Sequence, residues 1–390
     1  MKIKLNEILF YILILFPITT ILQGISVFGG INKLLIAIFI IILFFSLIKT
    51  KMKTSHMIVI LVSTLSYIIS LLLNKYNTVY NFNEYFYYLM WIYYLVFLAN
   101  NYYKIIEFTK EKIRVISVIN IIWSVLVLVS MVIPSCYVTA WGGDKYFMSF
   151  ASGEHRFAST CLFEFCLIFL SWIITKKKYN LFLIIIPIIG IFMSGARTYL
   201  GVILILFLVL YYTKYKKSKI FIPSMIVLIC ALIWLITMTP MMNKMSHTLE
   251  GSEKGNNMSA LTSSRSDFWR VDLESFKKED VINKVFGNGI NYVYVINGQN
   301  GFGYIWAHND YINILLSFGY IGLIMYILAY LFFINSLKKD VKKFEKIILT
   351  VVCGFNAFFN MLYTYTCSTL AIPFILYALC IVRNLEEKNE

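Results

Sequence analysis

The chain has 390 residues, of which 59% are hydrophobic and only 14% are charged. Soluble domains contain roughly 45–50% apolar and about 25% charged residues, so this composition excludes a soluble globular domain and is typical of helices that face lipid. The formal net charge of +15 would suggest nucleic acid for a soluble protein, but in a membrane protein Lys and Arg set the topology, and we expect no nucleic-acid partner.

Twelve apolar runs follow one another along the chain. Backbone polar groups cannot stay unpaired in lipid, and the runs are continuous instead of alternating, so they are predicted to be helices and not the strands of a barrel. The sequence therefore predicts an all-α polytopic integral membrane protein, with residues 1–390 forming a single membrane domain. The predicted helices are 5–24, 31–48, 57–73, 84–100, 115–133, 158–175, 180–194, 198–213, 220–239, 309–335, 346–363 and 367–383.

Basic residues alternate between the two sides of the predicted bundle. If the N-terminus is cytoplasmic, most Lys and Arg residues fall in inner segments, such as Lys176 to Lys178 and Lys338 to Lys346. Cytoplasmic loops carry such an excess of basic residues. The pattern predicts that both termini are cytoplasmic and that residues 240–308 form one large extracytoplasmic loop between helices 9 and 10.

The large loop divides into two parts. Residues Ser246 to Ser264 are rich in Gly, Asn, Ser and Thr and have the composition of a linker. From Arg265 to Lys278 the apolar residues recur at roughly helical spacing, and Ser264 with Asp267 forms a weak capping box. We predict a short amphipathic helix that lies near the outer membrane surface.

Three arginines on the outer side are candidate binders of a phosphate group. Arg197 follows Ser194-Gly195-Ala196 in a break between two helices, where a guanidinium can hold a phosphate with two hydrogen bonds or simply reach the interface from a helix end. Arg265 and Arg270 lie on the loop helix, about 140° apart around its axis. The alternative for both is a solvated basic face or contact with anionic head groups.

A carboxylate lies within the sixth predicted helix. Glu164 is about two turns deeper than Arg156, which ends the loop 134–157. An ionisable group inside the membrane needs a partner, and Arg156 or Arg197 can supply one. Glu164 and Arg156 are therefore candidate substrate-binding residues, and the alternative is a structural ion pair between helices.

His308 is the candidate general base. It lies where the loop re-enters the membrane and is followed by Asn309, Asp310 and Tyr311, polar residues that open an apolar helix, and we expect Asn309 and Tyr311 to bind substrate. Histidine titrates near neutral pH and can accept a proton, although a lone histidine is more often structural. His155 and His247 lack such neighbours. No metal-ligand spacing and no phosphate-binding glycine loop is present, so no cofactor is expected.

Three segments in a fixed order resemble the O-antigen polymerase and ligase superfamily, that is, the Wzy-type polymerases and WaaL-type ligases. The resemblance covers about residues 190–325, and Gly195-Ala196 departs from the small hydroxyl residues typical of the first motif. The matching segments are Ser194-Gly195-Ala196-Arg197; Arg265 to Trp269 with Phe286-Gly287-Asn288-Gly289; and His308-Asn309-Asp310-Tyr311-Ile312 with Phe318-Gly319-Tyr320-Ile321-Gly322.

The resemblance implies a membrane glycosyltransferase. Family members transfer a glycan from an undecaprenyl diphosphate carrier at the outer face of a bacterial cytoplasmic membrane, without metal or nucleotide. By analogy, Arg197 and Arg265 would neutralise the leaving diphosphate, and His308 would assist the attacking hydroxyl in an inverting transfer. The implied partners are the undecaprenyl-diphosphate-linked oligosaccharide and membrane lipid, with a chain-length regulator and a flippase of the same pathway.

Three functions remain open at this point. The abundance of Ile, Lys, Asn, Tyr and Phe reflects AT-rich codons, which favours a low-GC bacterium without lipopolysaccharide and hence a polymerase of capsular or other surface polysaccharide. An O-antigen ligase is the first alternative. A lipid-linked oligosaccharide flippase is the second, but transporters typically place charged residues near the midplane, whereas here they cluster at the outer face.

Overall fold

The computed structural model describes residues 5–50, 52–74, 83–140, 143–215, 218–219, 221–239, 241–243, 246, 259, 262 and 265–387. Helices dominate this part of the chain, and the expected all-α polytopic class is confirmed. The predicted capping residue Ser264 and most of the predicted linker lie outside the described residues.

Each of the twelve predicted apolar runs overlaps a helix. Among the described residues, seven helical segments are long and apolar enough to cross a membrane, namely α2, α3, α5, α6, α8, α15 and the pair α17–α18, while α1, α7 and α9 are shorter. The number of crossings therefore stays a prediction. The helices are α1 Leu5–Ile21, α2 Ser26–Lys49, α3 Thr54–Leu72, α4 Asn83–Glu111, α5 Ile113–Met131, α6 Glu154–Thr175, α7 Tyr179–Ser194, α8 Arg197–Tyr215, α9 Phe221–Thr237, α15 Asp310–Ser336, α16 Lys343–Phe359, α17 Thr366–Leu370 and α18 Ile372–Glu387.

The helices extend beyond some of the predicted ranges. The run 84–100 marks only part of α4, which continues to Glu111, and α2 begins five residues before the predicted start at 31. Apolar composition reports the segment that contacts lipid or the core, whereas a helix continues into polar sequence as long as its backbone hydrogen bonds are made.

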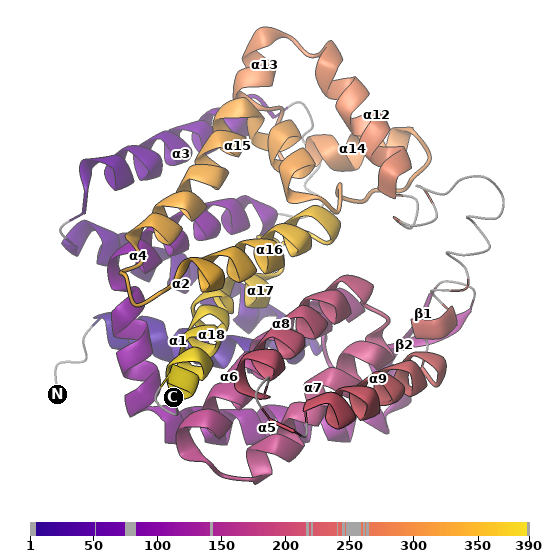
Figure 1. Cartoon of the computed structure of the whole chain (residues 1–390). Helices are drawn as coiled ribbons and strands as arrows, with labels where there is room; N and C mark the ends of the chain where they lie inside the picture. Colours follow the sequence, from indigo (N-terminus) through magenta and orange to yellow (C-terminus); the bar gives the residue numbers. More distant parts are fainter. Residues whose placement is uncertain are drawn as a thin grey trace.

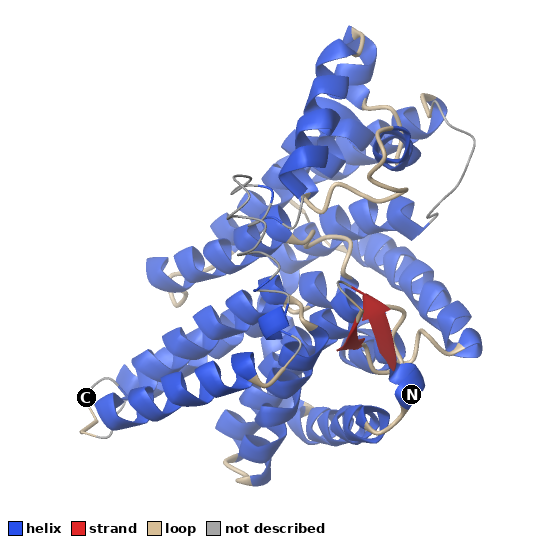
Figure 2. Cartoon of the chain, turned by 90° about the vertical axis from the view of Figure 1, so that its right-hand side faces the viewer, coloured by secondary structure: helices blue, strands red, loops and turns tan. Residues whose placement is uncertain are grey.

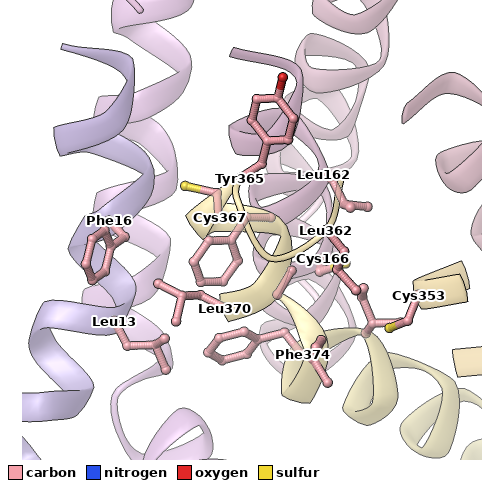
Figure 3. Packing of buried hydrophobic residues seen from close by; sticks show 14 of the residues in the cluster. Leu13, Phe16, Leu162, Cys166, Cys353, Leu362, Tyr365, Cys367, Leu370 and Phe374 are labelled. Carbon is pink, nitrogen blue, oxygen red and sulfur yellow. The ribbon is translucent and has the colours of Figure 1, made fainter. Parts of the chain in front are cut away.

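The centre of the bundle is formed by α6 and by α17–α18, which are the most buried of the seven candidate spans. Figure 3 shows Leu370 of α17 and Phe374 of α18 beside Leu13 and Phe16 of α1, with Leu162 of α6 on the other side of the same apolar cluster. These central helices are therefore packed on most sides by other parts of the protein.

The described end of the large loop folds into three helices. They are α12 Arg265–Lys278, α13 Val281–Phe286 and α14 Asn291–Gln299, and Figure 1 shows them grouped next to α15. The predicted amphipathic helix 265–278 is thereby confirmed. A small apolar core that includes Phe276 of α12, Tyr292 of α14 and Leu316 of α15 holds the group together.

A two-stranded antiparallel hairpin lies in the loop 134–157. Strand β1 Tyr137–Ala140 pairs with β2 Asp144–Phe147, and Figure 2 shows it as the two red arrows. Its four-residue strands are too short to give a clear alternation of polar and apolar residues. In the described β2, Tyr146 and Phe147 are both buried.

Helix α15 is interrupted at Gly319, whose backbone has φ +66° and ψ −166°. The break releases carbonyl groups that would otherwise lack donors inside the membrane. The backbone N–H of Asn288 donates to Leu316 O at 3.0 Å, and that of Gly289 donates to Ser317 O at 3.1 Å. The turn after α13 therefore supplies hydrogen-bond donors for the carbonyl groups that are released at the break. Irregular backbone at membrane depth requires such partners.

Two glycines make this contact sterically possible. A Cβ atom on Gly287 would lie 2.2 Å from the carbonyl oxygen of Ser317, and one on Gly319 would lie 2.4 Å from the carbonyl carbon of Val285. Both glycines also have positive φ, which favours glycine. We call this contact between residues 285–289 and 316–319 the glycine interlock.

Candidate functional site

Arg197 is positioned by the break between α7 and α8. Gly195 ends α7 in the left-handed conformation, with φ +62°, and the hydroxyl of Ser194 accepts the backbone N–H of Ala196 at 3.3 Å. The left-handed cap terminates α7, and Arg197 begins α8 directly afterwards, half-buried at the helix start. The segment Ser194-Gly195-Ala196 thus places Arg197 at the first position of α8.

Arg265 reaches the same region from α12. Its guanidinium donates to the backbone carbonyl of Phe359, at the end of α16. Burial lowers the pKa of Arg265 to about 10, and the charge of Arg197 adds to the lowering, so Arg265 remains cationic at neutral pH. Within the described residues, Arg265 forms no ion pair with a carboxylate. Two neighbouring guanidinium groups in a partly buried place favour an anionic ligand.

His308 stands at the junction of the loop and α15. Its backbone has φ +50°, a region that few residues other than glycine adopt and that is common at functional sites. Its ring centroid lies 6.4 Å from that of Phe268, 6.2 Å from that of Trp306 and 6.3 Å from that of His155. The imidazole is therefore set among aromatic rings and a second imidazole.

The residues after His308 anchor α15. Asn309 is the N-cap, and its side chain accepts the backbone N–H of Ile312 at 3.2 Å. One carboxylate oxygen of Asp310 accepts the hydroxyl of Tyr326 at 2.5 Å and the backbone N–H groups of Leu362 and Tyr363 at 3.0 and 3.3 Å. Asn309 thus caps the helix that follows His308, and Asp310 fastens the start of this helix to the α16–α17 connection.

Tyr311 packs against the bundle. Its ring lies 6.2 Å from that of Tyr326 in an edge arrangement, and it belongs to the half-buried side chains around the main core. The described contacts of Tyr311 are therefore packing contacts with other residues of the bundle.

Three further side chains complete the cluster around His308 and were not selected as candidates from the sequence, namely Tyr365, Tyr146 and His155. Tyr365 lies 6.1 Å from His155 and 6.2 Å from Trp306 between ring centroids, and it interacts electrostatically with Arg265. Figure 3 shows its hydroxyl pointing away from the apolar cluster. Tyr146, from β2, interacts in the same way with Arg197.

These three residues carry little sequence signal. Tyr146 and Tyr365 are two of 28 tyrosines, and neither belongs to a recognisable motif. His155 adjoins Arg156 at the end of the loop 134–157, so only its neighbourhood pointed to the site. The approach of His155 to His308 depends on how α6 and α15 are placed, which no local pattern encodes.

Two of the predicted arginines make their described polar contacts with residues outside this cluster. Arg270 is exposed and pairs with Glu274 one turn further along α12, at 3.8 Å. Arg156 donates to the hydroxyl of Ser152 at 3.0 Å. The angle of about 140° between Arg265 and Arg270 on a helix explains why only one of them faces the bundle.

Glu164 is fully buried in α6. With the amide of Asn120 oriented so that both its nitrogen and its oxygen have partners, Asn120 donates to Glu164 Oε2 at 3.1 Å. The ion pairs found among the described residues do not include one between Glu164 and Arg156 or Arg197. The carboxyl group instead contacts Asn120 of α5.

Comparison with protein families places this site in context. Residues 182–327, which are less than half of the chain, match the sequence model of the O-antigen ligase family. The match includes Arg197, Arg265 and His308 and supports the O-antigen polymerase and ligase superfamily indicated by the motifs. A comparison with curated proteins finds no match.

The match and the fold together define a coarse class. They support a function of the O-antigen polymerase or ligase type, that is, a glycosyltransferase-like enzyme of a bacterial membrane.

Proposed function

We propose that the protein polymerises lipid-linked oligosaccharide units into a capsular or other surface polysaccharide. The observation that carries the proposal is the buried guanidinium of Arg265, which donates to the end of α16 and is acted on by the charge of Arg197 from a different helix. A pair of guanidinium groups suits a diphosphate, because each planar fork can hold two phosphate oxygens. The donor would be an oligosaccharide on undecaprenyl diphosphate, at the outer face of the cytoplasmic membrane.

In the proposed reaction a hydroxyl group of the acceptor sugar attacks the anomeric carbon of the donor from the side opposite the diphosphate. The bond between that carbon and the diphosphate oxygen breaks, and its electron pair leaves with the diphosphate. Arg197 and Arg265 stabilise the developing negative charge, a role that metal ions fill in many other phosphate-leaving reactions. His308 takes the proton of the hydroxyl, and the configuration at the anomeric carbon is inverted.

The ligase and flippase alternatives differ in acceptor and in step. A ligase would transfer the finished glycan to a lipopolysaccharide core, and the composition of the chain favours an organism without one. A flippase would move the lipid-linked unit across the membrane, yet the two arginines and His308 gather around the large loop and the helix starts beside it.

The test is substitution of His308. We expect His308→Ala and His308→Gln to reach the membrane but to form no long polymer, because neither side chain accepts the proton, and single repeat units should accumulate at the outer face. EDTA should leave the wild type unaffected. The measurements are gel analysis of the surface polysaccharide and mass spectrometry of the lipid-linked pool. A full polymer ladder from His308→Ala would exclude His308 from the chemistry, and a pool trapped at the inner face would indicate a flippase.

A further inference from the structure

A groove opens at one end of the bundle, where α5 begins and α6 ends. It is lined by the first turns of α5, by the end of α6 and by the connection to α7, and its volume is about 490 Å³. Both α5 and α6 are long and apolar enough to span a membrane. Because the ends of such helices lie at the depth of the lipid head groups, the groove lies at the membrane interface.

Two cationic side chains line this groove from different elements. Arg114 belongs to the first turn of α5, and Lys177 belongs to the connection between α6 and α7. Both are exposed, and neither takes part in the ion pairs found among the described residues. The lining of the groove contains no Asp or Glu in the described structure. The groove therefore attracts an anion.

The two hydroxyl groups of the lining donate within their own helices. The hydroxyl of Ser117 donates to Ile113 O at 2.9 Å, and that of Thr175 donates to Ser171 O at 2.6 Å. The guanidinium and the ammonium are therefore the groups of this groove that are best suited to hold an anionic ligand.

The rest of the lining is mostly apolar. Val118 and Ile121 are exposed on α5, and Ile174 adds a half-buried side chain from α6. Tyr179 lies beside Lys177, whose amine is 5.8 Å from the centre of the tyrosine ring, and tyrosine is enriched at membrane interfaces. The lining therefore suits a ligand that has a negatively charged head and an apolar chain.

We propose that this groove binds an anionic phospholipid, whose phosphate lies between Arg114 and Lys177 and whose acyl chain lies against Val118 and Ile121. The arginine fork can hold two phosphate oxygens, and the lysine adds a second positive charge. Basic pockets between membrane helices bind anionic head groups in this way. The predicted topology places the groove in the inner leaflet, and the inference does not depend on the proposed glycosyl transfer.

The test is native mass spectrometry of the full-length protein, which is delipidated in detergent and titrated with phosphatidylglycerol or with phosphatidylcholine of the same acyl chains. We expect the wild type to bind phosphatidylglycerol more tightly. The double substitution Arg114→Gln and Lys177→Gln should weaken the binding of phosphatidylglycerol by roughly 10- to 30-fold and should not change that of phosphatidylcholine. Both side chains are exposed, so the variant should fold.

The matched control is the double substitution Lys339→Gln and Lys343→Gln. It removes two exposed charges from another basic cluster on the same predicted side of the membrane, and it should keep the affinity of the wild type. Basic residues at helix ends also set the topology, a role that needs their charge but no groove, and this control separates that role from lipid binding.

The acyl chain is tested by filling the apolar part of the groove. Val118→Trp should weaken the binding of phosphatidylglycerol without any change in charge, because the indole ring takes the space of the chain. Val125→Trp is its control, since Val125 lies two turns further along the same side of α5, is exposed to a similar degree and does not line the groove. If the double cation variant does not fold, this comparison decides the question.

Four results would overturn the proposal. They are equal affinity of the wild type for the two lipids, unchanged binding of phosphatidylglycerol by the double cation variant, an equal loss in the lysine control, and full displacement of the lipid by glycerol 1-phosphate at equal concentration. The third would mean that the total surface charge acts instead of the groove. The fourth would mean a site for soluble phosphate compounds.

Discussion

Arg265 is a cation whose charge is opposed by its surroundings. Burial lowers its pKa, the Arg197 charge adds to this effect, and its guanidinium is held by a backbone carbonyl of α16. A buried cation that faces another cation is unfavourable unless a ligand compensates. We therefore expect the planar shape of the guanidinium group at position 265 to matter for ligand binding as much as its positive charge.

We expect Arg197→Lys and Arg265→Lys each to reduce polymer formation by roughly 100-fold. Lysine keeps the positive charge but lacks the planar fork that binds two phosphate oxygens. The control is Arg270→Lys, which changes an exposed arginine of the same helix and should keep near-normal activity. Polymer yield per membrane-inserted protein is the measurement. Near-normal yields from both site variants would contradict a diphosphate-binding role.

Asp272 is a second buried ionisable residue of α12, and it lies outside the membrane-spanning segments. Its side chain is fully buried. Burial raises its pKa from 3.8 to about 8, and Asn297 offsets this only in part, since neither carboxylate oxygen of Asp272 makes a hydrogen bond of good geometry in the described structure. The folded protein therefore favours the neutral acid.

The sign of the effect on stability follows from the raised pKa. Between pH 3.8 and 8 the folded state binds a proton that the unfolded state has lost, so stability falls as pH rises, by up to about 1.4 kcal/mol per pH unit. We expect Asp272→Asn to remove this loss and to be more stable than the wild type at pH 8. Thermal unfolding of both proteins in detergent from pH 4 to 9 tests this, with Glu274→Gln as the exposed control. Parallel curves for wild type and Asp272→Asn would disprove it.

The local sequence could predict part of the site. Arg197 follows a helix break, Arg265 opens an amphipathic segment, and His308 precedes the polar start of a helix, so each stands out in its own neighbourhood. Tyr365 and His155 do not. Their place beside one another results from the packing of α17 against α6, which involves apolar residues that many alternative pairings would satisfy equally.

At the scale of elements, the glycine interlock joins the outer helices to the bundle. The turn that follows α13 supplies the donors for the carbonyls released at the break in α15, and the hydroxyl of Ser70 in α3 also donates to Ser317 O, at 2.5 Å. Three segments that are far apart in the sequence therefore depend on one backbone contact.

Alanine at Gly287 or Gly319 should prevent this contact. Each added Cβ would overlap backbone atoms, and the alanine would have to adopt the positive φ of the glycine that it replaces. We therefore expect a loss of several kcal/mol in stability and a low yield of folded protein. Gly354→Ala in α16 is the control, because a Cβ there meets nothing within 4 Å, and it should be neutral or slightly stabilising. Size-exclusion profiles and melting temperatures in detergent give the comparison. Normal melting of Gly319→Ala would show that the contact contributes little.

The elements were predictable in proportion to their length and regularity. The range 265–278 for the amphipathic helix agrees with α12, because its apolar residues recur at roughly helical spacing over 14 residues. By contrast, α13 spans six residues and each hairpin strand four. Periodicity needs a longer window than these elements provide, and their stability comes from tertiary contacts instead of local pattern.

At the scale of the whole molecule, the orientation across the membrane rests on the distribution of basic residues. Figure 1 shows α18 ending on the left side of the molecule and the β1–β2 hairpin on the right. Which of these sides faces the cytoplasm is a prediction from the Lys and Arg clusters.

We expect a cysteine introduced at Lys254 to react with a membrane-impermeant maleimide in intact cells, and one introduced at Lys177 to react only after the cells are opened. The first position belongs to the predicted outer loop 240–308, and the second to an inner basic cluster. The unsubstituted chain, with its seven native cysteines, provides the background signal. Labelling at position 177 in intact cells would reverse the topology and move the proposed site to the cytoplasmic side.

The glycine interlock also limits how this protein can be recombined with its relatives. A chimera that takes residues 240–308 from another member of the superfamily but keeps its own α15 separates the two halves of the contact, residues 285–289 and 316–319. Unless the transferred loop fits the break in α15, its backbone N–H groups would not reach the carbonyl groups of residues 316 and 317. Those carbonyl groups would then lack hydrogen-bond donors. Exchange of acceptor or donor specificity by domain swapping should therefore succeed only when the crossover point lies beyond residue 319, so that both halves are inherited together.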